Sequence, residues 1–334
     1  MRIALTGNPN SGKTTMYNAL TGRNEKIGNW AGVTVDRKES PIKKAYTDSS
    51  KELIAVDLPG AYSMSPFTSE ESITSGYVKN EHPDAIINIV DATNIERNLY
   101  LSTQIMELGI PVVMAINMMD LVRKSGDQIN VDKLSKKLGC PVVEISALKG
   151  DGIKEAANKA VELAKKKTLS KPVHEFSKEA EDIIAAVENK LTGIKDEQKR
   201  FFAIKLLEKD DKIAAQMKSV PDVSDEIRRM EDTFDDDTES IITNERYTYI
   251  SSIIGECCKK AHGGKKLTLS DKIDRIVTNR FLALPIFAVI MYIVYYVSVT
   301  TVGGIATDWA NDGVFGDGWY LAGIGRSAYE EDAG

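Results

Sequence analysis

Residues 7–14, with the sequence GNPNSGKT, constrain this chain most, because they fit the pattern G-x-x-x-x-G-K-[ST] of a phosphate-binding loop. The loop follows the apolar stretch 3–5 and precedes the helix-compatible stretch 16–20, so it joins a predicted strand to a predicted helix. Backbone N–H groups at such a helix N-terminus converge on phosphates. Lys13 then adds a positive charge near the β- and γ-phosphates, and Thr14 offers a hydroxyl to Mg²⁺. We expect the nucleotide to be contacted by Gly7, Asn8, Pro9, Asn10, Ser11, Gly12, Lys13, Thr14 and Thr15.

A second predicted strand delivers residues that can select guanine. Residues 111–116 are apolar and end at Asn117-Met118-Met119-Asp120, and ligands of open α/β sheets bind at the carboxyl ends of the strands. Asp120 could accept hydrogen bonds from both the N1–H and the exocyclic amine of guanine. Adenine lacks this donor pair, so a carboxylate facing it would lose about 2–5 kcal/mol. This part of the base site is expected to comprise Asn117, Met118 and Asp120.

A further predicted strand, 141–145, leads into Ser146-Ala147-Leu148, which matches the S-A-[KL] turn behind the base in G proteins. Either base-site pattern alone would be weak evidence for a nucleotide site. Together with the phosphate-binding loop, and in this order, the two patterns predict a binding site for GTP and GDP.

Two further segments are predicted to sense the γ-phosphate. Asp57 follows the apolar strand 53–56 and could hold Mg²⁺ through its water shell, while the Gly60 amide meets the γ-phosphate. Upstream, Val33 and Thr34 lie in a second loop, and the Thr34 hydroxyl could join the Mg²⁺ shell when GTP is bound. Ala61 stands where many small GTPases carry a glutamine that orients the attacking water. Intrinsic GTP hydrolysis is therefore expected to be slow.

The chain resembles the FeoB family of bacterial ferrous iron transporters along its whole length. The resemblance rests on GNPNSGKTT at 7–15, GNWAGVTVDRK at 28–38, DLPGAYS at 57–63 and SEE at 69–71. It implies a cytosolic G domain, then a helical domain likened to a nucleotide-dissociation inhibitor, and then a polytopic membrane domain.

The resemblance also implies activation by K⁺. The positions that match its K⁺ site are Asn10, Gly28 and Trp30, and a monovalent cation there would supply transition-state charge as an arginine finger does. With this site included, the residues expected to serve GTP hydrolysis are Asn10, Lys13, Thr34 and Gly60.

Hydrophobic periodicity divides the chain into parts. Residues 1–167 alternate apolar strands with helical patterns, as in a doubly wound, mostly parallel α/β fold, and form the predicted GTP-binding G domain. Residues 170–262 are predicted to form an all-α domain, in which Ala180, Ile183, Ile184, Val187 and Leu191 share one helix face and segments 201–207 and 223–261 are also helical. A basic linker, a transmembrane helix and an extracytoplasmic loop are expected at 263–280, 281–307 and 308–334.

The transmembrane prediction rests on residues 281–307, which carry no charge and are long enough to cross about 30 Å of hydrocarbon. Five basic residues precede this stretch: Lys265, Lys266, Lys272, Arg275 and Arg280. Acidic residues follow it, namely Asp308, Asp312 and Asp317. The positive-inside rule therefore predicts a cytoplasmic G domain. A buried helix of a soluble protein is the alternative.

Composition limits the possible partners. The formal net charge of −6 gives no overall basic surface for nucleic acid, which argues against a ribosome-assembly GTPase. The three cysteines cannot form a disulfide framework, so a reducing cytosol suits them. Cys257, Cys258 and His262 could in principle bind iron, but packing at the end of a helix explains them more simply.

The sequence thus predicts the GTP-hydrolysing cytosolic region of a ferrous iron transporter of the bacterial cytoplasmic membrane, in which switch loops regulate or drive Fe²⁺ uptake. Its expected cofactors are GTP or GDP, Mg²⁺ and K⁺. Its expected partners are Fe²⁺, the lipid membrane, the remaining membrane domain of a longer transporter and possible further copies of the chain. A membrane-tethered signalling GTPase and a soluble assembly GTPase are the alternatives.

Overall fold

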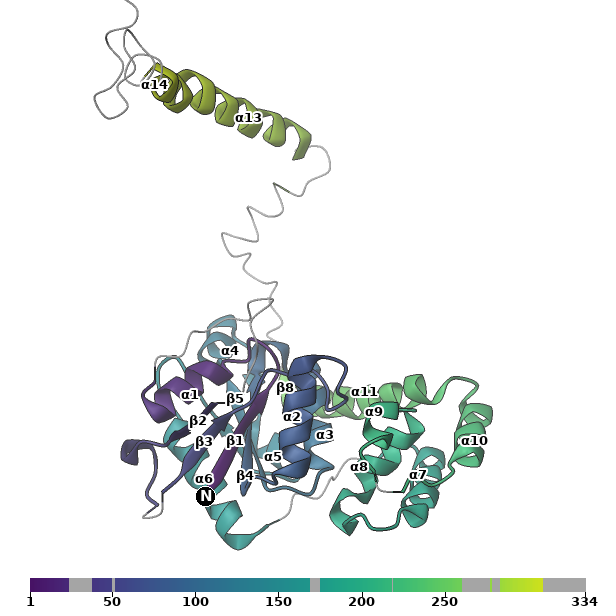
Figure 1. Ribbon diagram of the computed structural model, residues 1–334. Coiled ribbons are helices and arrows are strands. Elements are labelled where there is room, and N and C mark those ends of the chain that lie inside the picture. Colours follow the sequence, from purple (N-terminus) through teal and green to yellow (C-terminus); the bar gives the residue numbers. More distant parts are fainter. Residues whose placement is uncertain are drawn as a thin grey trace, which may run out of the picture. The chain divides into compact units, whose positions relative to one another are not determined.

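The computed structural model describes residues 1–23, 38–49, 52–168, 175–217, 219–259, 277 and 283–308. The chain divides into two units, Met1–Ala261 and His262–Gly334, which are described separately. The first unit contains a central sheet with helices around it and a helical part (Figure 1).

In the part of the chain that the structure describes, the sheet has six strands in the order β2-β3-β1-β4-β5-β7. All neighbouring strands are parallel except β2, which pairs antiparallel with β3. The strands span β1 Arg2–Gly7, β2 Lys38–Pro41, β3 Ile54–Asp57, β4 Ala85–Asp91, β5 Val112–Asn117 and β7 Val142–Glu144. The predicted strands at 3–5, 53–56, 111–116 and 141–145 are therefore confirmed, and their carboxyl ends lie along one edge.

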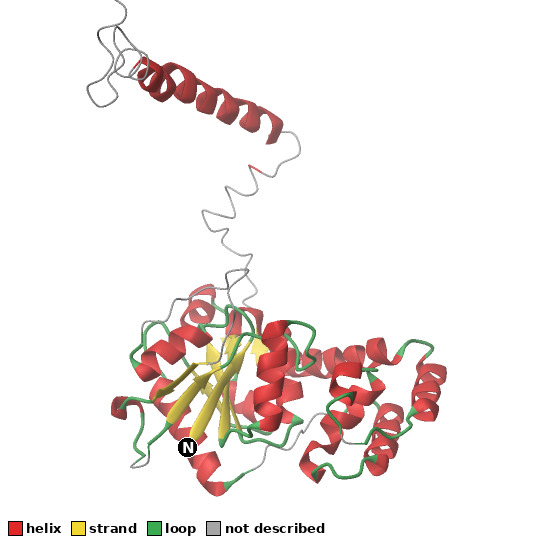
Figure 2. Ribbon diagram, in the orientation of Figure 1, coloured by secondary structure: helices red, strands yellow, loops and turns green. Residues whose placement is uncertain are grey.

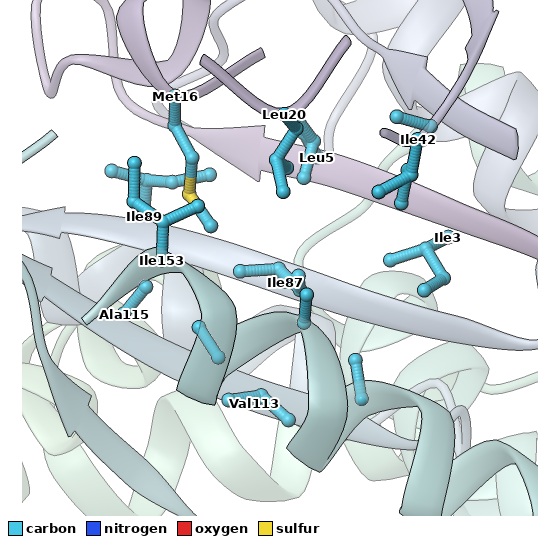
Figure 3. Packing of buried hydrophobic residues seen from close by; sticks show 14 of the residues in the cluster. Ile3, Leu5, Met16, Leu20, Ile42, Ile87, Ile89, Val113, Ala115 and Ile153 are labelled. Carbon is cyan, nitrogen blue, oxygen red and sulfur yellow. The ribbon is translucent and has the colours of Figure 1, made fainter. Parts of the chain in front are cut away.

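Helices cover both faces of this sheet, which confirms the doubly wound prediction. Alternate residues of a strand point to opposite faces. On one face, Ile3 and Leu5 pack with α1 and α6, as Figure 3 shows for Met16, Leu20 and Ile153. On the other face lie α2 and α3, with α4 and α5 packing beside β5. The helices span α1 Lys13–Thr21, α2 Ser69–Asn80, α3 Ile95–Met106, α4 Met119–Ser125, α5 Val131–Leu138 and α6 Ile153–Lys166, with short 3₁₀ turns η1 Lys44–Tyr46 and η2 Ala92–Asn94.

Within the described residues, the helical part consists of five helices. They are drawn in red to the right of the sheet in Figure 2. They are α7 Lys178–Lys190, α8 Asp196–Leu207, α9 Asp211–Ala214, α10 Ser224–Phe234 and α11 Thr238–Cys257. The apolar face predicted from Ala180 to Leu191 is buried in their common core. Between α10 and α11, Asp237 caps α11 by accepting a hydrogen bond from the Ser240 N–H.

The predicted helical stretch to residue 261 was wrong at its end. Helix α11 stops at Cys257, and Cys258–Lys259 form strand β8, which pairs antiparallel with β6 at Gln128–Ile129. Where the sequence predicts the helix to continue, the chain instead pairs with a strand that is distant in sequence. The C-terminal half of α11 packs against the sheet domain, because Ile250 and Ile253 share a core with residues of α3 and α5.

In the second unit, α13 Ala283–Tyr296, a π-helical segment Val297–Thr301 and α14 Val302–Asp308 follow one another. Within the described residues, Ala283–Thr307 is the one helix long and apolar enough to cross a membrane, with a mean hydropathy of 2.0. It matches the predicted stretch 281–307 to within two residues.

Candidate nucleotide-binding site

The phosphate-binding loop lies between β1 and α1, as the sequence predicts. Asn10 and Gly12 adopt left-handed backbone conformations, with φ of 66° and 92°. A side chain at Gly12 would clash with the Asn117 amide, so glycine is required there by space as well as by conformation. Thr14 and Thr15 lie in the first turn of α1. The loop therefore depends on Gly12 both for its left-handed backbone and for its close packing against Asn117.

Lys13 and Asp57 meet in this loop. The Lys13 Nζ lies 2.7 Å from the Asp57 Oδ1, and about a tenth of each side chain is exposed. In the same loop, the Ser11 hydroxyl and the side-chain Oδ1 of Asn8 are buried without hydrogen-bond partners among the described residues. A nearly buried ion pair beside unused polar groups fits a triphosphate with Mg²⁺, because the ammonium suits phosphate oxygens and the carboxylate suits a hydrated Mg²⁺.

The segment after β3 lies directly against the phosphate-binding loop. A Cβ added at Gly60 would lie 3.0 Å from the Pro9 nitrogen and 3.1 Å from the Pro9 Cα. The Ala61 N–H donates to the Gly7 carbonyl at 3.2 Å, and the Ala61 side chain is buried. Ala61 thus packs as a core residue and cannot orient a water molecule through its side chain.

Asn117 links the phosphate half of the site to the base half. Its Nδ2 donates to the Ser11 carbonyl at 2.8 Å, and its Oδ1 accepts from the Ala147 N–H at 2.9 Å. The side chain is buried, so both hydrogen bonds are shielded from water. This amide fixes the spacing between the phosphate-binding loop and the turn at 146–148. Sequence reasoning assigned Asn117 to the base alone and missed this bridge.

Asp120 lies at the start of α4, after Met118, whose backbone is left-handed at φ 65°. The Ser146 hydroxyl is 3.4 Å from the Asp120 Oδ1, and the Lys149 Nζ is 3.4 Å from the Oδ2. Partial desolvation raises the pKa of the Asp120 carboxyl, but the Lys149 ammonium and hydrogen bonds outweigh it, and the pKa is lower than usual. Asp120 is therefore a carboxylate at neutral pH, as a guanine acceptor must be.

The turn at 146–148 is divided between the core and the surface. Ser146 and Ala147 are buried, whereas 87% of Leu148 is exposed. An exposed apolar side chain in this turn offers a surface on which a planar base can rest.

The segment 61–71 is held by residues that sequence reasoning did not assign to this role. Glu71 caps α2 through Thr68, and its Oε1 accepts from the N–H groups of Tyr62 and Ser63, each at 3.3 Å. From α3, the Gln104 Oε1 accepts from the Met64 N–H at 2.7 Å. Gln104 could have been suspected, because it is a polar residue on the apolar face of a helix.

The helical part contacts the same segment. The buried Lys205 of α8 donates to the Ser65 hydroxyl at 2.8 Å and also pairs with Glu208. The Lys212 Nζ of α9 donates to the Pro66 carbonyl at 2.7 Å. These lysines lie about 140 residues away in sequence, and no local pattern predicts the contacts.

Several predicted residues fall outside the described residues: Gly28, Trp30, Val33, Thr34 and His262. Their predicted roles in binding K⁺, Mg²⁺ or iron stay predictions. Within the described part of the chain, no group of three or more His, Cys, Asp or Glu side chains could hold a metal ion. Cys257 is buried in the core that α11 shares with α3 and α5, and Cys258 packs against this core.

Comparison with protein families gives two matches. Residues 1–160 match the family model for ferrous iron transport protein B, and residues 176–259 match the model for the FeoB cytosolic helical domain. The chain is 37% identical over 313 residues to the Fe(2+) transporter FeoB of Salmonella typhimurium, and 35% identical over 310 residues to that of Escherichia coli. Each alignment covers 91% of this chain and 39% of the relative, so the chain spans about two fifths of these transporters.

Solved structures are similar over the first unit. NFeoB from S. thermophilus bound to mGMPPNP is 42% identical, with a TM-score of 0.70, and the match covers 79% of this chain and 99% of that one. The same protein bound to GDP.AlF4⁻ and K⁺ is 42% identical, with a TM-score of 0.69 over 76% of this chain and 98% of that one.

Proposed function

The chain belongs to the FeoB family, and on this premise we propose that its first unit binds GTP and hydrolyses it to GDP and phosphate, as the cytosolic region of a longer ferrous iron transporter. The observation that carries the proposal is the bridge made by Asn117. One buried amide joins the phosphate-binding loop at Ser11 to the base-side turn at Ala147. Such a bridge sets a fixed distance between a phosphate site and a base site, which is what a nucleotide requires.

In this proposal the phosphate half works by position and charge. The backbone of residues 7–14 and the Lys13 ammonium bind the phosphates, and Asp57 and Thr14 would hold Mg²⁺, which supplies charge neutralisation on the β- and γ-phosphates when bound. The Gly60 amide would donate to the γ-phosphate. Thr34 is proposed to bind Mg²⁺ only when GTP, and not GDP, occupies the site.

The hydrolytic step needs groups other than a glutamine after Gly60, because Ala61 is buried and apolar. A water oxygen must attack the γ-phosphorus while the bond to the β,γ-bridging oxygen breaks. We propose that turnover is slow and that K⁺, held by Asn10, Gly28 and Trp30, speeds it. Bound K⁺ would supply positive charge where negative charge develops. Support comes from the exposed, left-handed position of Asn10 within the phosphate-binding loop and from the K⁺ complex of NFeoB.

The apolar helix Ala283–Thr307 supports membrane attachment. Its 25 residues rise about 37 Å at 1.5 Å each, which exceeds the roughly 30 Å of hydrocarbon in a bilayer. We propose that this helix is the first to cross the bacterial cytoplasmic membrane, with the G domain in the cytoplasm and Fe²⁺ as the cargo of the complete protein. The FeoB relatives favour a transporter over a signalling GTPase or a soluble assembly GTPase.

The test of this function is the base selectivity of Asp120. Asp120→Asn should weaken GTP binding at least tenfold and improve binding of xanthosine triphosphate, because an amide replaces one of the two acceptor oxygens with a donor. Titration with fluorescent nucleotides measures both affinities. Asp127→Asn makes the same chemical change outside the proposed base site and should leave both affinities unchanged. Unaltered GTP affinity in Asp120→Asn would remove Asp120 from the base site.

A further inference from the structure

Arg97 contacts both segments that flank the proposed position of the γ-phosphate. It lies in the first turn of α3, exposed to solvent, and its guanidinium carbon is 4.3 Å from the centre of the Tyr62 ring. Its backbone carbonyl accepts a long hydrogen bond, at 3.5 Å, from the side-chain Nδ2 of Asn8. One residue of α3 is thus linked to the phosphate-binding loop and to the segment that follows Gly60.

The backbone at Arg97 is fixed by the sheet. The next residue, Asn98, has a buried side chain that accepts a hydrogen bond from the Asp91 N–H at 3.2 Å and donates to the Asn94 carbonyl at 2.9 Å. Asp91 is the last residue of β4, which lies between β1 and β5 in the middle of the sheet. Arg97 is therefore anchored to the central strands, independently of Tyr62.

The Tyr62 ring has fewer restraints. Its backbone N–H donates to the Glu71 carboxylate at 3.3 Å, but 42% of the residue is exposed. A cation within about 6 Å of an aromatic ring centre is attracted to the ring face, so the guanidinium of Arg97 restrains this half-exposed ring.

We propose that Arg97 is a positioning residue for GTP hydrolysis, because it holds Tyr62, and through it Gly60, against the phosphate-binding loop. This inference rests on the proposed function, in which the Gly60 amide donates to the γ-phosphate. Gly60 and Tyr62 are two residues apart, so a displacement of the ring moves the amide. Arg97 acts through the ring and needs no contact with the nucleotide.

The arrangement that this contact favours is the one suited to the γ-phosphate. In it the Ala61 N–H is bonded to the Gly7 carbonyl, and Gly60 lies against Pro9. Without the contact, the Gly60 amide is displaced in a larger fraction of the GTP-bound molecules, so kcat falls with the population of the held arrangement. An exposed cation–π contact changes such a population by about two- to fivefold.

The experiment measures phosphate release from GTP by the full-length chain in detergent, in KCl. Arg97→Met should lower kcat about two- to fivefold and leave KM within about twofold of the wild-type value, since the groups proposed to bind GTP are unchanged. Active sites are counted by titration with labelled GDP, so a loss of folded protein is not mistaken for a lower kcat. Arg229→Met, at an exposed position of α10, is the matched control and should keep the wild-type kcat.

Variants of Tyr62 test whether Arg97 acts through the ring. Tyr62→Leu removes the ring but keeps the charge of Arg97, and it should lower kcat by the same factor. Tyr62→Phe keeps the face of the ring and should stay close to wild type. The double variant Arg97→Met/Tyr62→Leu should be no slower than either single variant, because all three lose the same contact.

An unchanged or raised kcat in Arg97→Met would overturn the inference. A normal kcat in Tyr62→Leu beside a low one in Arg97→Met would also overturn it, because the guanidinium would then act without the ring. A wild-type chain that binds GTP but hydrolyses it no faster than buffer would instead refute the proposed function. This second failure appears in the wild-type assay, before any variant is compared.

Discussion

The buried pair of Arg246 and Glu107 allows a sharp test of how the helical part is joined to the G domain. Arg246 of α11 donates to both carboxylate oxygens of Glu107, at 2.7 and 2.9 Å, and to the Thr103 hydroxyl at 3.2 Å. Both charged side chains are fully buried. Burial alone would lower the pKa of Arg246, but Glu107 more than offsets it, and the pKa is raised. The guanidinium stays charged at every accessible pH.

Removing one member of the pair should be far more damaging than removing both. Arg246→Met takes two charge-assisted hydrogen bonds from a carboxylate that stays buried, which costs about 3–5 kcal/mol of unfolding free energy. The double variant Arg246→Met/Glu107→Leu buries no charge at this site. Because a buried ion pair often does little better than packed apolar side chains, we expect the double variant to lie within about 1 kcal/mol of wild type.

Urea unfolding of residues 1–261, which form one compact unit, measures these free energies. Circular dichroism and fluorescence should give coincident transitions if a two-state analysis applies. Arg123→Met is the matched control, because Arg123 makes an exposed pair with Glu144, and it should cost at most about 1 kcal/mol. A double variant that loses the sum of the two single losses would refute the reasoning, since it would show that the contacts act independently.

Three further predictions concern other parts of the first unit. Asn10→Ala should abolish the faster phosphate release in KCl than in NaCl while leaving GDP affinity nearly unchanged; equal wild-type rates in the two salts would contradict the K⁺ site. Lys205→Met removes the bond to Ser65 and should speed amide hydrogen exchange at residues 61–67 in the GDP-bound state, without a change in α7; unchanged exchange there would refute this contact as a restraint. Burial lowers the pKa of Lys79 to about 8, from an ordinary value of 10.5, although Asp210 opposes the shift. Between these pH values the unfolded chain binds more protons than the folded one, so this group makes unfolding free energy rise with pH. Urea midpoints at pH 7.5 and 9.5 should show that Lys79→Met loses this rise, and an identical rise in the variant would assign it to other groups.

Sequence reasoning predicted the sheet and the edge where the site lies, because each signal was local. Strands end at Gly7, Asp57 and Asn117 and two residues before Ser146, and the parallel arrangement brings those ends together. The end of α11 was not predictable in this way. Cys258 and Lys259 continue a helical pattern, and their pairing with residues 128–129 depends on a partner about 130 residues away.

The burial of two charged residues could not be predicted from the sequence, for a related reason. Lys205 and Arg246 lie in helical stretches where a single charged residue normally faces solvent. Their burial depends on acceptors supplied by other elements, namely Ser65 for Lys205 and Glu107 for Arg246. Periodicity predicts which face of a helix is apolar, but it carries no information on a distant carboxylate that makes a buried charge tolerable.

The segment 61–71 is where these long-range contacts bear on the proposed function. Gly60 lies against Pro9 of the phosphate-binding loop, so a shift of the loop at the γ-phosphate would displace the residues that follow. Those residues are bonded to Glu71, to Gln104 and, from the helical part, to Lys205 and Lys212. A contact biases a two-state segment only if it differs between the states. Each of the two lysine contacts is a hydrogen bond from a charged group, which contributes about 1.5–3 kcal/mol. If GTP binding breaks these contacts, the helical part favours the state in which they form. Nucleotide exchange is then coupled to the position of α8 and α9.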